Sequence, residues 1–419
     1  MNSRRKTFSP CRAAGSLFLS LVVTGALVAT PASAVTITIK SNDAFQQGVN
    51  DPKPVGPVGG NPGTTLGAQR RFVFQHAANA WGLRLAGNVP IVVSASFQSL
   101  GGTANSAVLG SARPVTLERD FPSAPKILTW YVAGLLHQFA GKDRNDLSPG
   151  LCPDPLVEGK CPEIYTRFNG DVDGPTVLGT VDFYYGIDGN SGSDIDFLSV
   201  VLHELAHGLG VIDLIDPATG KISPSGDPGS DSCQNCSDAY SYNLENPKYN
   251  PKRLSQMTNN QRLLSIVDDG VLVWAGASVV AASVKLQAGV RGDGAVQIYA
   301  PKTYAPGSSI SHFDTDVAPN ELMEPFSSLP PPRDLAVSLA MLKDIGWTLI
   351  PVPRCGDANA DAKTTTADAL LALRGAVGSA ACPAYLCDVN LSGGVTSADA
   401  LLLLKRSVGQ PTSLACPLA

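Results

Sequence analysis

The sequence is poor in charge and in long apolar runs. Only 16% of its 419 residues are charged, against about a quarter in an average soluble domain. This low charge excludes a disordered acidic or basic tail protein and a coiled coil, because both depend on charged residues. Glycine (41 residues) and proline (32 residues) are abundant instead, which favours a globular protein with many loops.

Basic residues do not outnumber acidic ones, and the formal net charge is −5. Nucleic-acid binding needs a basic face, so we expect no nucleic-acid partner. Beyond the N-terminal segment, the longest apolar run lies near residues 273–284 and is too short to cross a bilayer. We therefore expect no transmembrane segment in the mature chain.

Residues 1–34 have the pattern of a secretory signal peptide. Basic residues occupy positions 4–6, an apolar stretch covers 16–29, and small residues at 32–34 form a cleavage site. An uncleaved membrane anchor is the alternative. Removal of this segment, which holds four basic and no acidic residues, changes the net charge from −5 to −9. The sequence predicts a secreted, extracellular protein.

Cysteine usage agrees with export. One of the nine cysteines lies in the predicted signal peptide, which leaves an even number suited to disulfides in an oxidising compartment. Cys152 and Cys161 flank a short loop and are expected to pair. Cys233 and Cys236 form a CxxC motif, for which we favour a disulfide over half of a zinc site. Three pairings are open to the other four, which are Cys355, Cys382, Cys387 and Cys416.

Histidine is rare, with five in the chain, yet two of them stand four residues apart in the motif HELAH. Residues 194–210 are predicted to form a helix, with Asp194 as its cap and Asp196 in its first turn. In this helix His203 and His207 lie on one face and can bind one ion. Zinc suits imidazole nitrogens in a site with three ligands and an open position. Glu204 lies beside them and can take a proton from a water molecule that such an ion activates.

A third ligand is needed, and the sequence leaves two candidates. Asp213 stands where HExxHxxGxxD would place a carboxylate, and His312 lies far along the chain. His76 falls beside the apolar face of a predicted helix, and His137 falls in an apolar stretch, so we interpret both as packing residues. His312 is then the only imidazole left.

The motif HELAHGLG, followed far downstream by SHFD and NELMEP, resembles the metzincin zinc peptidases and, among them, the leishmanolysin-like branch. The resemblance implies that Glu204 is the general base and that Met323 lies in a methionine-containing turn beneath the metal. Asp213 would be the third ligand in the alternative, as in snapalysin-like peptidases. The zinc ligands that the resemblance favours are His203, His207 and His312.

The resemblance also implies an architecture. Residues 35–350 would form an α+β domain with a small twisted sheet, an active-site helix and an insertion at about 214–305, which is longer than the family leads one to expect. A linker at 351–354 would lead to a second module at 355–419. Residue patterns predict strands at 35–40, 90–97, 127–132, 163–168 and 180–185, and helices at 66–83, 194–210 and 334–345.

The second module contains an internal duplication, in which GDANADAKTTTADALLALRGAVG at 356–378 returns as CDVNLSGGVTSADALLLLKRSVG at 387–409. Each copy has oxygen donors spaced as in an EF-hand loop, so we expect each to bind one structural Ca²⁺ rather than to be a helical repeat without an ion. Because aspartate ends each loop, the pair resembles dockerin repeats, which implies a small all-α module and a possible cohesin-like partner. The expected calcium ligands are Asp357, Asn359, Asp361, Lys363 (through its carbonyl) and Asp368 in the first loop, and Asp388, Asn390, Ser392, Gly394 (through its carbonyl) and Asp399 in the second.

The two loops differ at their sixth position, where the chain turns sharply. Gly393 allows this turn in the second loop, whereas the first has Ala362, for which a positive φ is strained. Asp361 gives the first loop a charge where the second has the neutral Ser392. We expect both loops to bind calcium and do not rank them.

These features predict a secreted zinc endopeptidase that cleaves protein or peptide substrates through a zinc-activated water, with Glu204 as general base. One zinc ion would be catalytic, and two calcium ions would be structural. The alternative is a non-catalytic exported adhesion or assembly protein that acts through its calcium-dependent dockerin-like module.

Overall fold

The structure, a computed structural model, describes residues 33–145, 152, 157–224, 235–351, 354–359 and 361–416. The predictions for the signal peptide up to residue 32, for Cys233 and for linker residues 352–353 lie outside these described residues. The described part of the chain mixes helices with several small sheets, which agrees with the predicted α+β class. Within it, no helix is long and apolar enough to cross a membrane.

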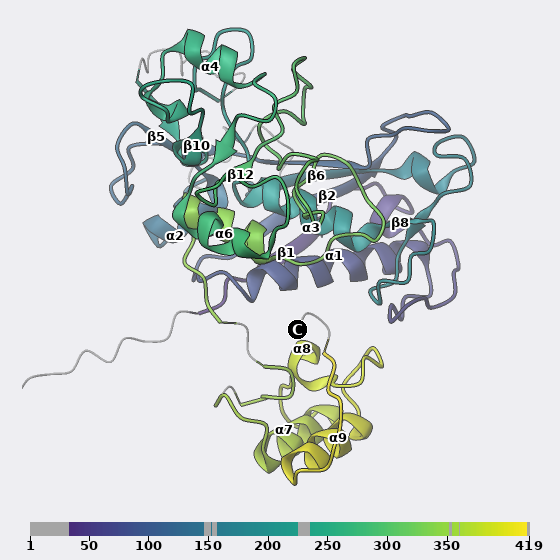
Figure 1. The fold of residues 1–419 in the computed structure, drawn as a ribbon. Helices are drawn as coiled ribbons and strands as arrows, with labels where there is room; N and C mark the ends of the chain where they lie inside the picture. Colours follow the sequence, from purple (N-terminus) through teal and green to yellow (C-terminus); the bar gives the residue numbers. More distant parts are fainter. Residues whose placement is uncertain are drawn as a thin grey trace, which may run out of the picture. The chain divides into compact units, whose positions relative to one another are not determined.

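The largest sheet has four strands in the order β1-β2-β6-β3 (Figure 1). β1 (Ile37–Ser41), β2 (Ile91–Gln98) and β6 (Ile164–Asn169) run parallel and lie close to their predicted ranges. β3 (Gly110–Pro114) runs antiparallel to β6 and forms one edge of the sheet. Its sequence, GSARP, lacks the β-branched and aromatic residues typical of a strand, so the residue pattern did not indicate it.

Two long helices pack against this sheet and against each other (Figure 1). α1 (Leu66–Gly82) begins after Thr65, whose side chain caps the helix. α3 (Phe197–Leu209) carries the HELAH motif. The indole N–H of Trp81 at the end of α1 donates to the carbonyl of Leu202 in the middle of α3, at 3.1 Å. This bond between two buried elements fixes the lengthwise position of α3 against α1.

The start of α3 differs from the sequence-based expectation. The pattern suggested Asp194 as the cap and Asp196 in the first turn, but Asp196 is the cap, because its side chain accepts a hydrogen bond from Ser199 N–H at 2.8 Å. The reason is that β8 (Ile195–Asp196) pairs with β7 (Phe183–Tyr184), which keeps the chain extended up to the cap. Gly210 ends the helix with a φ of 126°, a conformation that glycine adopts freely.

The described residues of the predicted insertion, 214–224 and 235–305, form a region of short elements joined by loops. Its sheet has the order β10-β11-β12, while β9 extends a separate sheet in the order β4-β5-β9. The indole of Trp274 donates to Asp344 of α6 at 3.0 Å, which ties this region to the later helix. The bounds are β4 (Leu117–Glu118), β5 (Thr129–Val132), β9 (Ser237–Asp238), β10 (Leu244–Glu245), β11 (Val273–Trp274), β12 (Val296–Gln297), α2 (Ala133–Ala140), α4 (Asn259–Ser265), α5 (Ala277–Ala282) and α6 (Ala336–Ile345). Short 3₁₀ turns cover Gly48–Asn50, Gly170–Asp173, Ser241–Asn243, Leu254–Gln256 and Ser283–Lys285.

The C-terminal residues form three helices, α7 (Thr366–Ala376), α8 (Ala384–Cys387) and α9 (Ser397–Ser407), around a small apolar cluster of their own. Two disulfides, Cys355–Cys416 and Cys382–Cys387, close this region and select one of the three open pairings. The predicted pair Cys152–Cys161 is also formed. Because the cluster is small, the disulfides supply cross-links that a core of this size needs.

Gly208 of α3 packs directly on β6. A Cβ atom at this position would overlap Ile164 Cγ2 and lie 2.8 Å from Cδ1. In an open helix, Gly→Ala stabilises by about 1 kcal/mol. Here we expect Gly208→Ala to destabilise by about 1–3 kcal/mol, because overpacking outweighs the helix propensity. Urea unfolding measures the change.

The control for this prediction is a double-mutant cycle. Ile164→Ala removes the atoms that collide, so the double variant should lose less stability than the sum of the two single losses. A stabilised Gly208→Ala variant would show that α3 does not approach β6 this closely.

Candidate metal centre and active site

Three histidines from two distant parts of the chain converge on one point. The Nε2 atoms of His203 and His207 lie 3.0 Å apart, and that of His312 lies 3.1 Å from the first and 3.2 Å from the second. His203 and His207 meet because they are one helical turn apart on α3. His312 reaches them from a segment 105 residues beyond His207. The structure thus brings together the three residues proposed as zinc ligands.

The other nitrogen of each ring faces a backbone carbonyl. His203 Nδ1 lies 2.7 Å from Leu322 O, His207 Nδ1 lies 2.6 Å from Val211 O, and His312 Nδ1 lies 2.8 Å from Ser308 O. A carbonyl only accepts hydrogen bonds, so Nδ1 carries the proton in each ring. The three Nε2 atoms are then unprotonated, and their lone pairs point at one another.

Burial keeps the rings neutral. It lowers the pKa of His207 to about 3, with a further contribution from His203, and it also lowers the pKa values of His203 and His312. Three neutral acceptors this close repel one another unless a cation lies between them. Two ligands of a tetrahedral zinc with bonds of 2.0–2.1 Å stand about 3.3 Å apart, near the spacing found here. The donor set and its spacing therefore fit zinc.

Glu204 lies next to this cluster on α3, and only 7% of its surface is exposed. Its Oε2 has no hydrogen-bond partner among the described residues. Burial raises the pKa of Glu204 to about 8, and a hydrogen bond from the backbone N–H of Ala112 opposes the rise. Ala112 belongs to the edge strand β3, which packs against α3. A carboxylate held in this way has one oxygen fixed by the strand and the other available for a proton.

Asp213, the alternative third ligand, is not part of the histidine cluster among the described residues. Its Oδ2 accepts a hydrogen bond from the hydroxyl of Ser311 at 2.8 Å, and its Oδ1 accepts one from Ile215 N–H at 2.8 Å. Burial raises the pKa of Asp213 to about 7, which these hydrogen bonds oppose. The carboxylate is thus bound to the residue that precedes His312.

Met323 is fully buried. The carbonyl of Met323 accepts a hydrogen bond from Phe313 N–H at 2.8 Å, and the preceding residue, Leu322, holds His203. The turn that contains Met323 therefore contacts both the residue that follows His312 and the ring of His203 on α3.

In the C-terminal region, the carboxylates of each proposed calcium loop fold back on the loop. Asp357 accepts hydrogen bonds from the N–H groups of Asp361 and Ala362, and Asp388 accepts them from Ser392 and Gly393, at 2.8–2.9 Å. Further hydrogen bonds within the two loops join Asn359 with Asp361, Lys363 N–H with Asp361, Asn390 with Ser392, and the Ser392 hydroxyl with Gly394 O.

The last aspartate of each loop is also the third residue of the following helix and completes the capping box at its start. Asp368 accepts hydrogen bonds from the N–H and hydroxyl of Thr365, and Asp399 accepts the same pair from Thr396. Both carboxylates are fully buried. The sixth position is left-handed in both loops, with a φ of 67° at Ala362, so the predicted strain at this alanine is confirmed.

His76 and His137 lie apart from the metal cluster. Burial lowers the pKa of His76 to about 4, and its ring stacks on Phe72 at 6.2 Å. Both therefore behave as the packing residues that the sequence suggested, although His137 has charged neighbours that the sequence pattern did not reveal.

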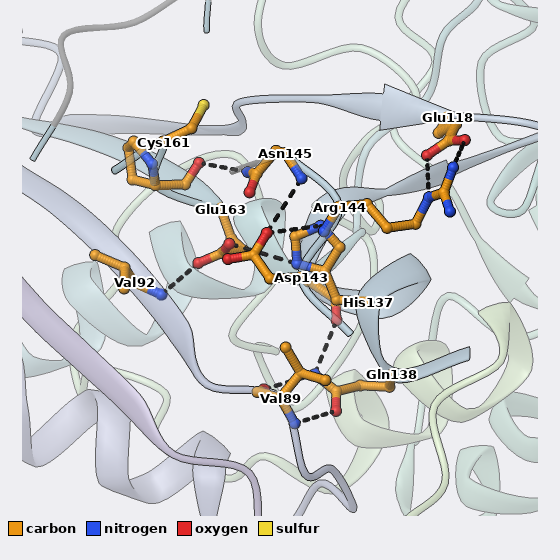
Figure 2. A network of polar contacts seen from close by, with 12 residues as sticks. Val89, Val92, Glu118, His137, Gln138, Asp143, Arg144, Asn145, Cys161 and Glu163 are labelled. Carbon is orange, nitrogen blue, oxygen red and sulfur yellow. Dashed lines mark hydrogen bonds and ion pairs between the residues drawn. The ribbon is translucent and has the colours of Figure 1, made fainter. Parts of the chain in front are cut away.

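Figure 2 shows these neighbours of His137. Its Nε2 accepts the N–H of Arg144 at 3.2 Å and lies 3.8 Å from Asp143, while its Nδ1 faces Glu163 at 3.4 Å. Histidine and two carboxylates are also a metal-ligand set. The two ring nitrogens face different partners: Nε2 accepts the N–H of Arg144, and Nδ1 has no hydrogen-bond partner among the described residues.

Several functional contacts escaped the sequence reasoning. The carbonyls that orient the three imidazoles come from Val211, Ser308 and Leu322, and every residue type has such a carbonyl. The N–H that holds Glu204 comes from a strand with no strand-like composition. The Ser311–Asp213 pair joins two side chains, but 98 residues separate its members, so no local pattern indicates it.

Comparison with protein-family models, curated proteins and solved structures gives no match for this chain. The chemistry of the site has to be read from its own geometry.

Glu321 lies near the turn that contains Met323, and its burial makes the stability of the metal-free protein depend on pH. Burial raises the pKa of Glu321 to about 8, and the charges of Asp334 and Glu324 add to the rise. A raised pKa means that the folded state binds a proton which the unfolded state has lost above about pH 4.5. Protonation of Glu321 therefore stabilises the folded state. Its contribution to the free energy of unfolding is complete below pH 4.5 and is lost as the pH rises through 8. The free energy of unfolding falls by at most about 1.4 kcal/mol per pH unit over this range.

We expect Glu321→Gln to abolish this loss. The free energy of unfolding of the wild type, relative to the variant, should fall between pH 4.5 and 8, as measured by denaturant titrations of metal-free protein. Parallel pH curves for the two proteins would contradict the prediction.

Proposed function

We propose that the protein is a zinc-dependent endopeptidase. The observation that carries the proposal is the convergence of three unprotonated Nε2 atoms, 3.0–3.2 Å apart, beside a buried glutamate. This is the donor set of a catalytic zinc site with an open position. The same residues carry the resemblance to metzincins of the leishmanolysin-like branch, and the buried turn at Met323 agrees with it.

In the proposed mechanism, the three histidines and Glu204 have different roles. Zinc held by the three histidines would polarise a peptide carbonyl and lower the pKa of water to about 7. Glu204 would take the proton of that water and pass it to the nitrogen of the leaving amine. The positive charge of the ion would oppose the burial effect on the pKa of Glu204 and keep the carboxylate ionised at neutral pH.

The edge strand β3 would orient the substrate. It pairs with β6 on one side only, so its other side can add an extended peptide as a further strand. Because Ala112 of the same strand binds Glu204, a peptide placed along β3 would lie next to the base. Protein and peptide substrates fit this arrangement, and the predicted signal peptide and the disulfides support secretion.

The C-terminal module would bind two structural calcium ions and dock onto a partner of cohesin-like type. Apolar side chains at equivalent positions of α7 and α9 are open to solvent, among them Leu370 (50% exposed) and its counterpart Leu401 (52%). Leu373 with Leu404 and Val377 with Val408 continue both rows. Exposed rows of this kind favour a protein partner.

These rows also favour the second candidate, an exported adhesion or assembly protein without catalysis. That candidate predicts binding through the module and no hydrolysis by the histidine site. It leaves the three converging Nε2 atoms without a role, so we rank it below the peptidase.

Glu204→Gln tests the peptidase. The variant keeps the shape of the side chain but cannot accept the proton, so casein hydrolysis should fall by about 10²–10⁴-fold while the zinc content stays at one ion per chain. Glu118→Gln, a change at a surface ion pair with Arg144, is the control and should keep its activity. Full hydrolysis by Glu204→Gln would sink the mechanism.

Calorimetric titration of the metal-free chain tests the calcium sites. The wild type should bind two Ca²⁺, whereas Asp357→Ala and Asp388→Ala should each bind one, because each removes the first carboxylate of one loop. Glu204→Gln should still bind two. Unchanged calcium binding in both loop variants would refute the assignment.

A further inference from the structure

The third-ligand segment, residues 308–314, lies against the insertion at 214–305 over most of its length. Tyr299 N–H donates to His312 O at 2.9 Å, and Ile310 N–H donates to Tyr299 O at 2.8 Å. Asp314 N–H donates to Gln297 O at 3.0 Å, in line with β12. The backbone on both sides of His312 is thus paired with the end of the insertion.

A buried tyrosine of the insertion binds the same segment from another direction. The hydroxyl of Tyr240 donates to the carbonyl of Ile310 at 2.7 Å across 70 residues. Tyr240 is 1% exposed, and its ring packs edge-on against Trp274 at 4.8 Å. Because the indole of Trp274 is itself bound to Asp344, the hydroxyl has a fixed position.

A second side-chain contact joins the segment to the chain that leaves the active-site helix. The Ser311 hydroxyl donates to Asp213 Oδ2 at 2.8 Å, and Asp213 N–H approaches the same hydroxyl oxygen at 3.3 Å. Asp213 is held in turn by Ile215 N–H. The residue before His312 is therefore tied to the turn that follows His207.

These contacts meet a specific need. His203 and His207 share one helix, so their separation is set by the helix itself, whereas His312 reaches them from a segment 105 residues beyond His207. Residues that orient a metal ligand typically change metal affinity by 10–100-fold when they are removed.

We propose that the described residues of the insertion at 214–305 form the scaffold that holds His312 in place for the metal, with Tyr240 as its positioning residue. Asp213 and Ser311, which lie just before and just after the insertion, are further positioning residues. This inference rests on the proposed zinc site, but it does not depend on the reaction. The long insertion would then have a structural role, which is to hold the third ligand in position.

Zinc affinity of the full-length chain, measured by competition with a chelator, tests the scaffold. Tyr240→Phe removes one hydroxyl and keeps the packed ring, and Ser311→Ala removes the bond to Asp213. Both should weaken zinc binding by about tenfold or more. Ser311→Thr keeps a hydroxyl and should restore most of the affinity.

Tyr242→Phe is the matched control. Tyr242 belongs to the 3₁₀ turn that follows Tyr240, and its ring faces Lys126 at 3.8 Å. It should bind zinc as the wild type does. Thermal unfolding of the metal-free proteins separates positioning from general stability, and the midpoints of Tyr240→Phe and Tyr242→Phe should agree within a few degrees.

Wild-type zinc affinity in both Tyr240→Phe and Ser311→Ala would overturn the proposal, as would a loss of metal-free stability that accounts for the whole effect. His312→Ala should lose more affinity than either, and a variant that keeps full affinity would overturn the role of the segment. If the variants lose zinc as expected but the wild type cleaves no casein, the scaffold stands and the proposed peptidase activity fails.

Discussion

The convergence of His203, His207 and His312 depends on three hydrogen bonds between imidazole Nδ1 atoms and backbone carbonyls. They decide which nitrogen of each ring carries the proton, and they turn three unprotonated nitrogens toward one point. Without a cation this arrangement is repulsive, and the fold around it has to hold it in place. α1, the four-stranded sheet, the Met323 turn and the insertion all contribute a contact that holds one of these rings or its neighbours.

Glu204 lies beside the three histidines, and its carboxylate is buried. Burial raises the pKa of this carboxyl group, and among the described residues the Ala112 N–H opposes that rise. In the proposed function, a cation at the histidines would lower the pKa again and leave Glu204 ionised beside β3. The cost of burying the carboxylate would then be linked to the binding of the metal.

The sequence predicted the parts of the structure that have local patterns. The four-residue spacing of His203 and His207, the parallel strands and the duplicated loops all have a period or a motif. Asp194 was the wrong cap because the β7–β8 pairing keeps the chain extended past it, and this pairing depends on residues elsewhere. β3 and the Ser311–Asp213 bond escaped for the same reason, since one is defined by its neighbours and the other joins residues 98 positions apart. Elimination among five histidines left His312 as one of two candidates beside Asp213, and only the resemblance to metzincins favoured it.

The aspartates that end the two C-terminal loops affect how the module would bind calcium. Asp368 and Asp399 are already fixed by the N–H and hydroxyl groups at the start of α7 and α9, and two disulfides close the region. A loop that is shaped in advance gives up little chain entropy when an ion arrives. If these loops bind calcium as proposed, the module would keep the same backbone conformation with and without the ion, and its occupancy would follow the calcium concentration.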